Sequence, residues 1–76
     1  MTNTVKLFNV SDLVIGISDY YNKLLIGVVI NHRKLIGFHC YKIEWVLTAE
    51  LTPIEGIEPE WHKQKYLSLF RRAINT

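Results

Sequence analysis

Two short apolar runs limit what this chain can fold into. The sequence LVIGI covers residues 13–17 and LLIGVVI covers residues 24–30, and both are rich in β-branched side chains. Such residues favour strands, and the intervening SDYYN (18–22) is typical of a turn. Neither run approaches the roughly 20 apolar residues of a membrane-spanning helix. We therefore expect two consecutive strands and no membrane partner.

A third run, GFHCYKIEWV (37–46), alternates apolar and charged residues. Tyr41, Ile43 and Trp45 fall on one face of a strand, and Lys42 and Glu44 on the other, because side chains alternate along a strand. The segment NHRKLIG (31–37) is predicted to connect the second run to the third. Three such runs predict a meander in a small sheet or barrel.

The last third of the chain, residues 59–74, has two readings. Pro59 at the first helical position, with Tyr66, Phe70 and Ala73 at three- and four-residue spacings, slightly favours a helix. The fold would then be a β-meander plus a C-terminal helix, an α+β arrangement. The other reading is a strand at EWHK, one helical turn at QKYLS and a last strand at LFRRAI.

The order of these elements resembles the small SH3-like barrel proteins encoded by tailed bacteriophages, including phages of marine bacteria. The stretches that carry the resemblance are SDLV (11–14), IGVVI (26–30), YKIEW (41–45), EWH (60–62) and YLSLF (66–70). The resemblance implies an all-β fold, a small five-stranded SH3-like barrel with one short helical turn near the C-terminus. It carries over no catalytic residue and implies an interaction or structural role, in the host cytoplasm or in the virion.

Length and composition fit this expectation. A chain of 76 residues, 49% hydrophobic and 21% charged, is expected to form one globular domain. The single cysteine, Cys40, allows no internal disulfide, and the first ten residues, MTNTVKLFNV, lack the pattern of a signal peptide. We therefore expect a cytoplasmic protein.

No residue pattern points to an enzyme or a cofactor. His39 and Cys40 are neighbours on a predicted strand and point to opposite faces, so they cannot easily share a metal ion or act as base and nucleophile. A site made of His32, His39 and His62 is geometrically feasible across adjacent strands, but structural zinc sites use four ligands. We expect no metal, no other cofactor and no small-molecule substrate.

The apolar runs carry more hydrophobic surface than one small core uses. Both are apolar on both faces, so the outer face needs a cover. The extension at 51–57, with Leu51, Ile54 and Ile57, is one candidate, and another protein or a second copy is the other. We predict a protein–protein interaction module, whose candidate interface residues are Val14, Ile15, Ile17, Leu25, Val28 and Ile30.

Basic residues suggest an alternative function. The net charge is +2 and the pI is near 8.8, which permits binding to an anionic partner. Aromatic side chains near cations stack on bases in small barrels that bind single strands. The candidate nucleic-acid contacts are Arg33, Lys34, Arg71, Arg72 and Trp61.

Overall fold

Residues 5–74 fold as a five-stranded antiparallel sheet with a single 3₁₀ turn. The computed structural model describes residues 5–74. Its elements are β1 (Leu13–Ile17), β2 (Leu24–Leu35), β3 (Phe38–Thr48), β4 (Glu60–Lys63), the 3₁₀ turn η1 (Gln64–Tyr66) and β5 (Ser68–Arg71). The strand order is β4-β3-β2-β1-β5. The all-β prediction is confirmed, whereas closure into an SH3-like barrel stays a prediction.

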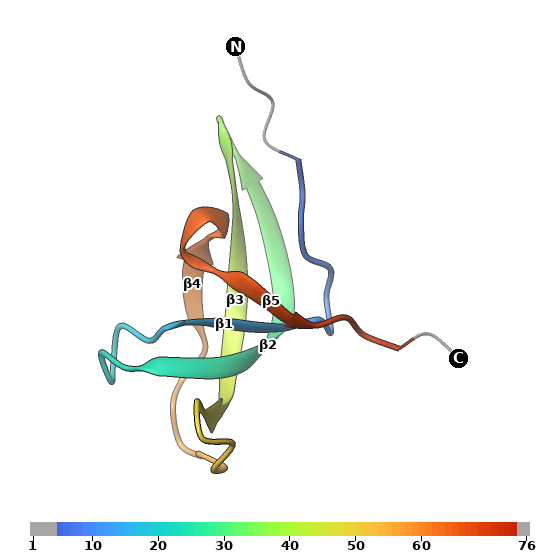
Figure 1. Cartoon of the computed structure of the whole chain (residues 1–76). Helices are drawn as coiled ribbons and strands as arrows, with labels where there is room; N and C mark the ends of the chain where they lie inside the picture. The colour runs from blue at the N-terminus through green and yellow to red at the C-terminus, as the bar shows by residue number, and fades with distance from the viewer. Residues whose placement is uncertain (1–4, 75–76) are drawn as a thin grey trace.

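Strand β2 is long and strongly curved. Its first half crosses the molecule beside β1, and its second half rises beside β3 (Figure 1). The β2–β3 register shifts between Ile26 and Gly27 and again between Val29 and Asn31. Such bulges bend a strand and increase its twist. One strand therefore belongs to two differently oriented parts of the sheet.

The predicted connector at residues 31–37 is mostly strand, so that prediction is wrong. Residues 31–35 continue β2 and pair with β3 as far as Leu35 opposite Phe38. Only Ile36 and Gly37 form the turn, and Gly37 has a φ of 83°, which a residue without a Cβ adopts at little cost. The backbone hydrogen bonds between β2 and β3 stabilise this segment as a strand, although its polar composition is typical of a loop.

The core lies on the inner face of the sheet. Tyr41, Ile43 and Trp45 are buried there, and Glu44 on the opposite face is exposed, which confirms the predicted alternation along β3; Lys42 beside it is half-buried. The other buried members of the core cluster are Phe8, Val14, Leu25, Val29 and Leu67. Ile54 and Ile57 pack against this cluster.

Two residues of the predicted outer interface belong to this core. Val14 is 0% exposed and Leu25 is 2% exposed. Burial alternates along β1, which puts Val14 on the inner side, and on β2 Leu25 is the first of three consecutive buried residues, Leu25 to Gly27. The prediction that Val14 and Leu25 contribute to a binding surface is therefore wrong.

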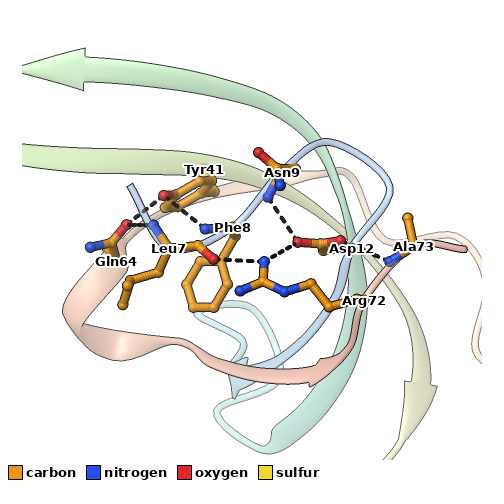
Figure 2. A network of polar contacts seen from close by, with 8 residues as sticks. All are labelled: Leu7, Phe8, Asn9, Asp12, Tyr41, Gln64, Arg72 and Ala73. Atoms are coloured by element: carbon orange, nitrogen blue, oxygen red, sulfur yellow. Dashed lines mark hydrogen bonds and ion pairs between the residues drawn. The ribbon is translucent and has the colours of Figure 1, made fainter. Parts of the chain in front are cut away.

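The C-terminal third follows the strand–turn–strand reading, and the predicted helix is wrong. Residues 60–64 alternate, with His62 and Gln64 buried and Trp61 and Lys63 exposed. Gln64 Oε1 accepts hydrogen bonds from the Leu7 amide and the Tyr41 hydroxyl, so Gln64 joins the N-terminal segment to the core (Figure 2). Within residues 5–74 there is no helix long and apolar enough to cross a membrane.

Candidate nucleic-acid interface

Three neighbouring strands present cations and aromatic rings on one outer face. Residues directly opposite one another on paired strands share a face of the sheet. Asn31, Lys42 and Trp61 form one such row, and Arg33, Cys40 and Lys63 form the next. Phe38 follows two residues before Cys40 on β3. The surface defined by Arg33, Phe38, Lys42, Trp61 and Lys63 is called the cation–aromatic face below.

The cations of this face lie over its rings. Arg33 Cζ is 4.7 Å from the ring centroid of Trp61, and Lys63 Nζ is 4.8 Å from that of Phe38. A chain of 76 residues contains on average roughly one significant cation–π pair, whereas two occur on this face alone. Trp61 is 36% exposed, so part of its ring is open to a ligand.

Charges of opposite sign gather at opposite ends of β3. The hairpin at one end carries Arg33, Lys34 and Lys42 without any acidic residue in 31–42, and the loop at the other carries Glu50, Glu55 and Glu58 without any basic residue in 49–59. Figure 1 shows the hairpin tip and this loop far apart. The 11 residues of β3 span about 35 Å, several times the screening length of ~8 Å at physiological salt. A ligand on the cation–aromatic face therefore meets net positive charge.

The structure brings together only some of the predicted nucleic-acid contacts. Arg33 and Trp61 meet on the cation–aromatic face. Lys34 lies opposite His39 and so on the other face of the hairpin, and Arg71 pairs with Leu13 at the β5 edge of the sheet. Consecutive strand residues alternate in direction, which separates Arg33 from Lys34. The prediction of one patch from all five residues is wrong.

Arg72 has a structural role instead. Its guanidinium donates hydrogen bonds to Asp12 Oδ2 at 2.9 Å and to the Leu7 carbonyl at 2.8 Å (Figure 2). Asp12 is 2% exposed and also accepts the amides of Asn9 and Ala73. Burial raises the pKa of Asp12, but these hydrogen bonds outweigh it and hold the pKa below its usual value. The network ties the N-terminal segment to the residues after β5.

Glu60 is a second carboxylate that accepts several hydrogen bonds, and it is half-buried. Its carboxylate accepts hydrogen bonds from Trp45 Nε1 at 2.8 Å, from the Ser18 hydroxyl and from the amides of Asp19 and Tyr20. His62 Nε2 lies 2.8 Å from Glu60 Oε1. Burial raises the pKa of Glu60, but these donors, His62 foremost, outweigh it and lower the pKa to about 2. Among residues 5–74, three side chains with metal-ligand atoms converge only at Asp19, Glu60 and His62.

The three histidines, which the sequence indicates are geometrically able to meet, do not come together. His32 and His39 meet across β2 and β3, with His32 Nε2 2.8 Å from His39 Nδ1, whereas His62 contacts Glu60. The two rings stack with centroids 5.0 Å apart. Burial, with smaller effects of Lys6 and His39, lowers the pKa of His32. Both rings lie on the inner face, behind the cation–aromatic face.

The remaining predicted interface residues line the outer face of β1 and β2. Leu13, Ile15 and Ile17 on β1 stand opposite Val28, Ile26 and Leu24 on β2, and these six residues are called the β1–β2 ladder below. Ile17 is 57% and Leu24 is 50% exposed, whereas Leu13, Ile15 and Val28 are half-buried and Ile26 is buried. Ile30, 37% exposed, lies at the bulge beyond Val28. The exposed apolar surface is therefore concentrated at the end of the ladder beside the 18–23 turn.

Sequence reasoning did not assign Phe38 or Lys42 to a site. The alternation of FHCYK puts Phe38, Cys40 and Lys42 on one side of β3, which the sequence indicates. Their meeting with Arg33 and Trp61 depends on the register of three strands, and no local pattern encodes that register.

Comparison of the chain with protein-family models, with curated proteins and with solved structures found no match. The SH3-like identity and the bacteriophage origin that the resemblance implies stay predictions.

Proposed function

We propose that the protein is a non-enzymatic module that binds single-stranded nucleic acid on the cation–aromatic face. The observation that carries the proposal is Arg33 held over Trp61, on a face that carries three cations and one carboxylate, Glu44, which follows Lys42 on the same side of β3. From the sequence alone, protein–protein contact is the favoured function. We favour nucleic-acid binding here because Arg33, Lys42 and Lys63 lie with Trp61 and Phe38 on one surface.

The chemistry of this face favours single strands over duplexes. An unpaired base stacks on an aromatic ring or on a guanidinium plane, which stabilises a complex by roughly 1–3 kcal/mol per base. Bases inside a duplex are already stacked on one another and do not reach Trp61 or Phe38. Phosphates between the bases are then placed to contact Arg33, Lys42 and Lys63.

Fluorescence anisotropy with a labelled 12-nucleotide single strand tests the proposal. Three phosphate contacts predict that raising salt from 50 to 200 mM weakens binding roughly 20-fold, because each contact releases condensed counterions. A duplex of the same sequence is expected to bind more weakly. Arg33→Glu and Trp61→Ala should each weaken binding to the single strand.

Lys23→Glu is the matched control for Arg33→Glu, because it makes the same change in net charge. Lys23 is exposed in the turn before β2, away from the cation–aromatic face. Equal losses in the two variants would mean that only overall charge matters. No binding at 50 mM salt, or no effect of Arg33→Glu, would contradict the proposal.

A second candidate function is self-association through the β1–β2 ladder. The observation that favours it is the pair of opposed residues Ile17 and Leu24, both at least half exposed. A domain of this size gains stability when it covers such surface with a second copy. Sedimentation of the wild type should show dimers whose fraction rises with concentration, and Leu24→Lys should abolish them. A wild type that stays monomeric at high concentration would contradict this candidate.

A further inference from the structure

A hollow lies where the cation–aromatic face ends, between the tip of the β2–β3 hairpin and η1. Its volume is about 550 Å³, within the range of pockets that hold small ligands. Its walls come from the N-terminal segment, the start of β3, the end of β4 and η1 with the residue after it. The residues that matter below are Leu7, Phe38, Lys63, Gln64, Lys65 and Leu67. This site is called the hairpin hollow.

The floor of the hairpin hollow is apolar and held in place. Leu67 is 7% exposed and belongs to the core cluster, and Leu7 presents apolar surface above it. Gln64 is buried; its Oε1 accepts hydrogen bonds from the Leu7 amide and the Tyr41 hydroxyl, and its Nε2 donates to the Val5 carbonyl. Gln64 is therefore a support beneath the hollow, and the hollow exists before any ligand arrives.

Two ammonium groups line the hairpin hollow. Lys63 Nζ lies 4.8 Å from the ring centroid of Phe38, and Lys65 Nζ lies 5.1 Å from that of Tyr66. Among residues 5–74, neither lysine forms an ion pair, and no carboxylate is found among the described residues of the lining. An anion that enters therefore meets two positive charges that no acidic side chain neutralises.

A second hollow has the opposite charge. It lies beside the acidic loop, has a volume of about 450 Å³ and is lined by Asp19, Glu58 and Glu60 together with Tyr20. Three carboxylates repel a phosphate group. Of the two hollows, the hairpin hollow is therefore the one that suits a phosphorylated ligand.

We propose that the hairpin hollow binds one nucleotide, with the phosphate at Lys63 and Lys65 and the base against the apolar surface of Phe38 and Leu7. A nucleotide joins a charged phosphate to a planar ring with apolar faces. Phosphate oxygens accept strong hydrogen bonds from ammonium groups, and bases stack on aromatic side chains. The lining therefore offers a partner to each half of this ligand.

The nucleotide comes from one of two sources. It is either free in solution or the phosphorylated end of a single strand on the cation–aromatic face, which adjoins the hollow through Phe38 and Lys63. The second source rests on the proposed function, whereas the first does not. Both use the same contacts in the hollow.

Titration of the ¹⁵N-labelled chain with adenosine 5′-monophosphate, followed by two-dimensional NMR, tests the proposal. We expect saturable shifts concentrated at the amides of residues 37–38 and 63–67. Lys65→Glu should weaken binding roughly tenfold, because one charge-assisted contact is lost. Lys23→Glu makes the same change in net charge in the turn before β2 and should alter binding little. Adenosine and inorganic phosphate should each bind more weakly than the nucleotide, because each supplies only one half of it.

Fluorescence anisotropy distinguishes the two sources. A 12-nucleotide strand is compared with the same strand phosphorylated at its 5′ end or at its 3′ end. Tighter binding of a phosphorylated strand, with the difference lost in Lys65→Glu, assigns the hollow to the end of a strand. Equal binding of all three strands, with the mononucleotide still bound, assigns it to a free nucleotide.

The proposal is overturned if the mononucleotide shifts lie outside the hollow. It is also overturned if Lys65→Glu, folded by its own NMR spectrum, binds the mononucleotide as the wild type or the Lys23→Glu variant does. Failure of every strand to bind would contradict the proposed function instead, and the mononucleotide titration would still decide this proposal.

Discussion

Glu60 shows how one side chain holds together segments that are distant in sequence. It lies on the inner side of β4 and accepts hydrogen bonds from Ser18, Asp19 and Tyr20 in the β1–β2 turn and from Trp45 on β3. Its side chain is 13% exposed. These hydrogen bonds favour the ionised form of the Glu60 carboxyl group. A neutral group in its place would accept fewer of them and would leave some donors without a partner.

Glu60 should make the protein sensitive to acid. Its pKa is about 2 in the folded protein, against an ordinary value of 4.5. Because the folded-state pKa is the lower one, the stabilisation is present above about pH 4.5 and is lost as the pH falls towards 2; it amounts to roughly 3 kcal/mol. Urea unfolding of the wild type should show this loss between pH 4.5 and 2.

Glu60→Gln should lower the free energy of unfolding at pH 7 and flatten its pH dependence over the same range. Glu58→Gln, a change at an exposed position in the preceding loop, is the control and should leave both unchanged. A pH profile of Glu60→Gln that parallels the wild type would contradict this role.

At the scale of elements, Gly27 is where β2 bends across β3. It stands opposite Trp45, next to a register shift. A Cβ at this position would meet the Ile43 side chain and would lie 2.8 Å from Trp45 Cε3 and 2.9 Å from the Glu44 carbonyl oxygen. Close packing of the two strands therefore requires a residue without a side chain.

Gly27→Ala should destabilise the protein by about 2–3 kcal/mol, because a backbone carbonyl and two core side chains would have to move. Gly16→Ala is the comparison. Its Cβ would lie 2.7 Å from Leu67 Cδ2, the end of a flexible side chain, and 3.4 Å from the nearest backbone oxygen. Urea midpoints should fall further for Gly27→Ala, and the reverse order would contradict this account of the bend.

The sequence predicts some of the strands better than others. Residues 13–17, 24–30 and 37–46 read as strands because their apolar content and alternation are local properties. Residues 33–35 were expected in a connector, and for residues 60–71 the local pattern slightly favoured a helix over the strand–turn–strand alternative. Their strands are short, polar or exposed, and they are stabilised by pairing with β3 and β1 rather than by their own propensity.

At the scale of the whole molecule, the chain ends close the core. Phe8 belongs to no strand, yet it is 3% exposed and packs edge-on against Tyr41, with ring centroids 5.1 Å apart. Arg72 bonds to the Leu7 carbonyl and to Asp12, so the segment before β1 is held by the segment after β5 (Figure 2). In a domain with so small a core, one such ring is a large part of the buried apolar surface.

Phe8→Ala should therefore destabilise the protein by about 3–5 kcal/mol, most of the stability expected for a domain of this size. Thermal unfolding followed by circular dichroism measures this loss. Val10→Ala, at a 52% exposed position two residues further on, should change the melting temperature little. Similar melting temperatures for Phe8→Ala and the wild type would mean that the N-terminal segment is not part of the folded core.

The sequence by itself determined the three strands of the meander, the inward side of β3 and the outward direction of Lys42, because these follow from local apolar content and from side-chain alternation. Only the tertiary structure decided which residues meet across strands. Arg33 and Trp61 are 28 positions apart in the chain, and Asp12 and Arg72 are 60 apart. Register, bulges and strand order set those distances. For the same reason Val14 and Leu25 are buried in the core, and Arg72 links the segment before β1 to the segment after β5. Register also places Arg33, Lys42 and Lys63 on one face of the sheet.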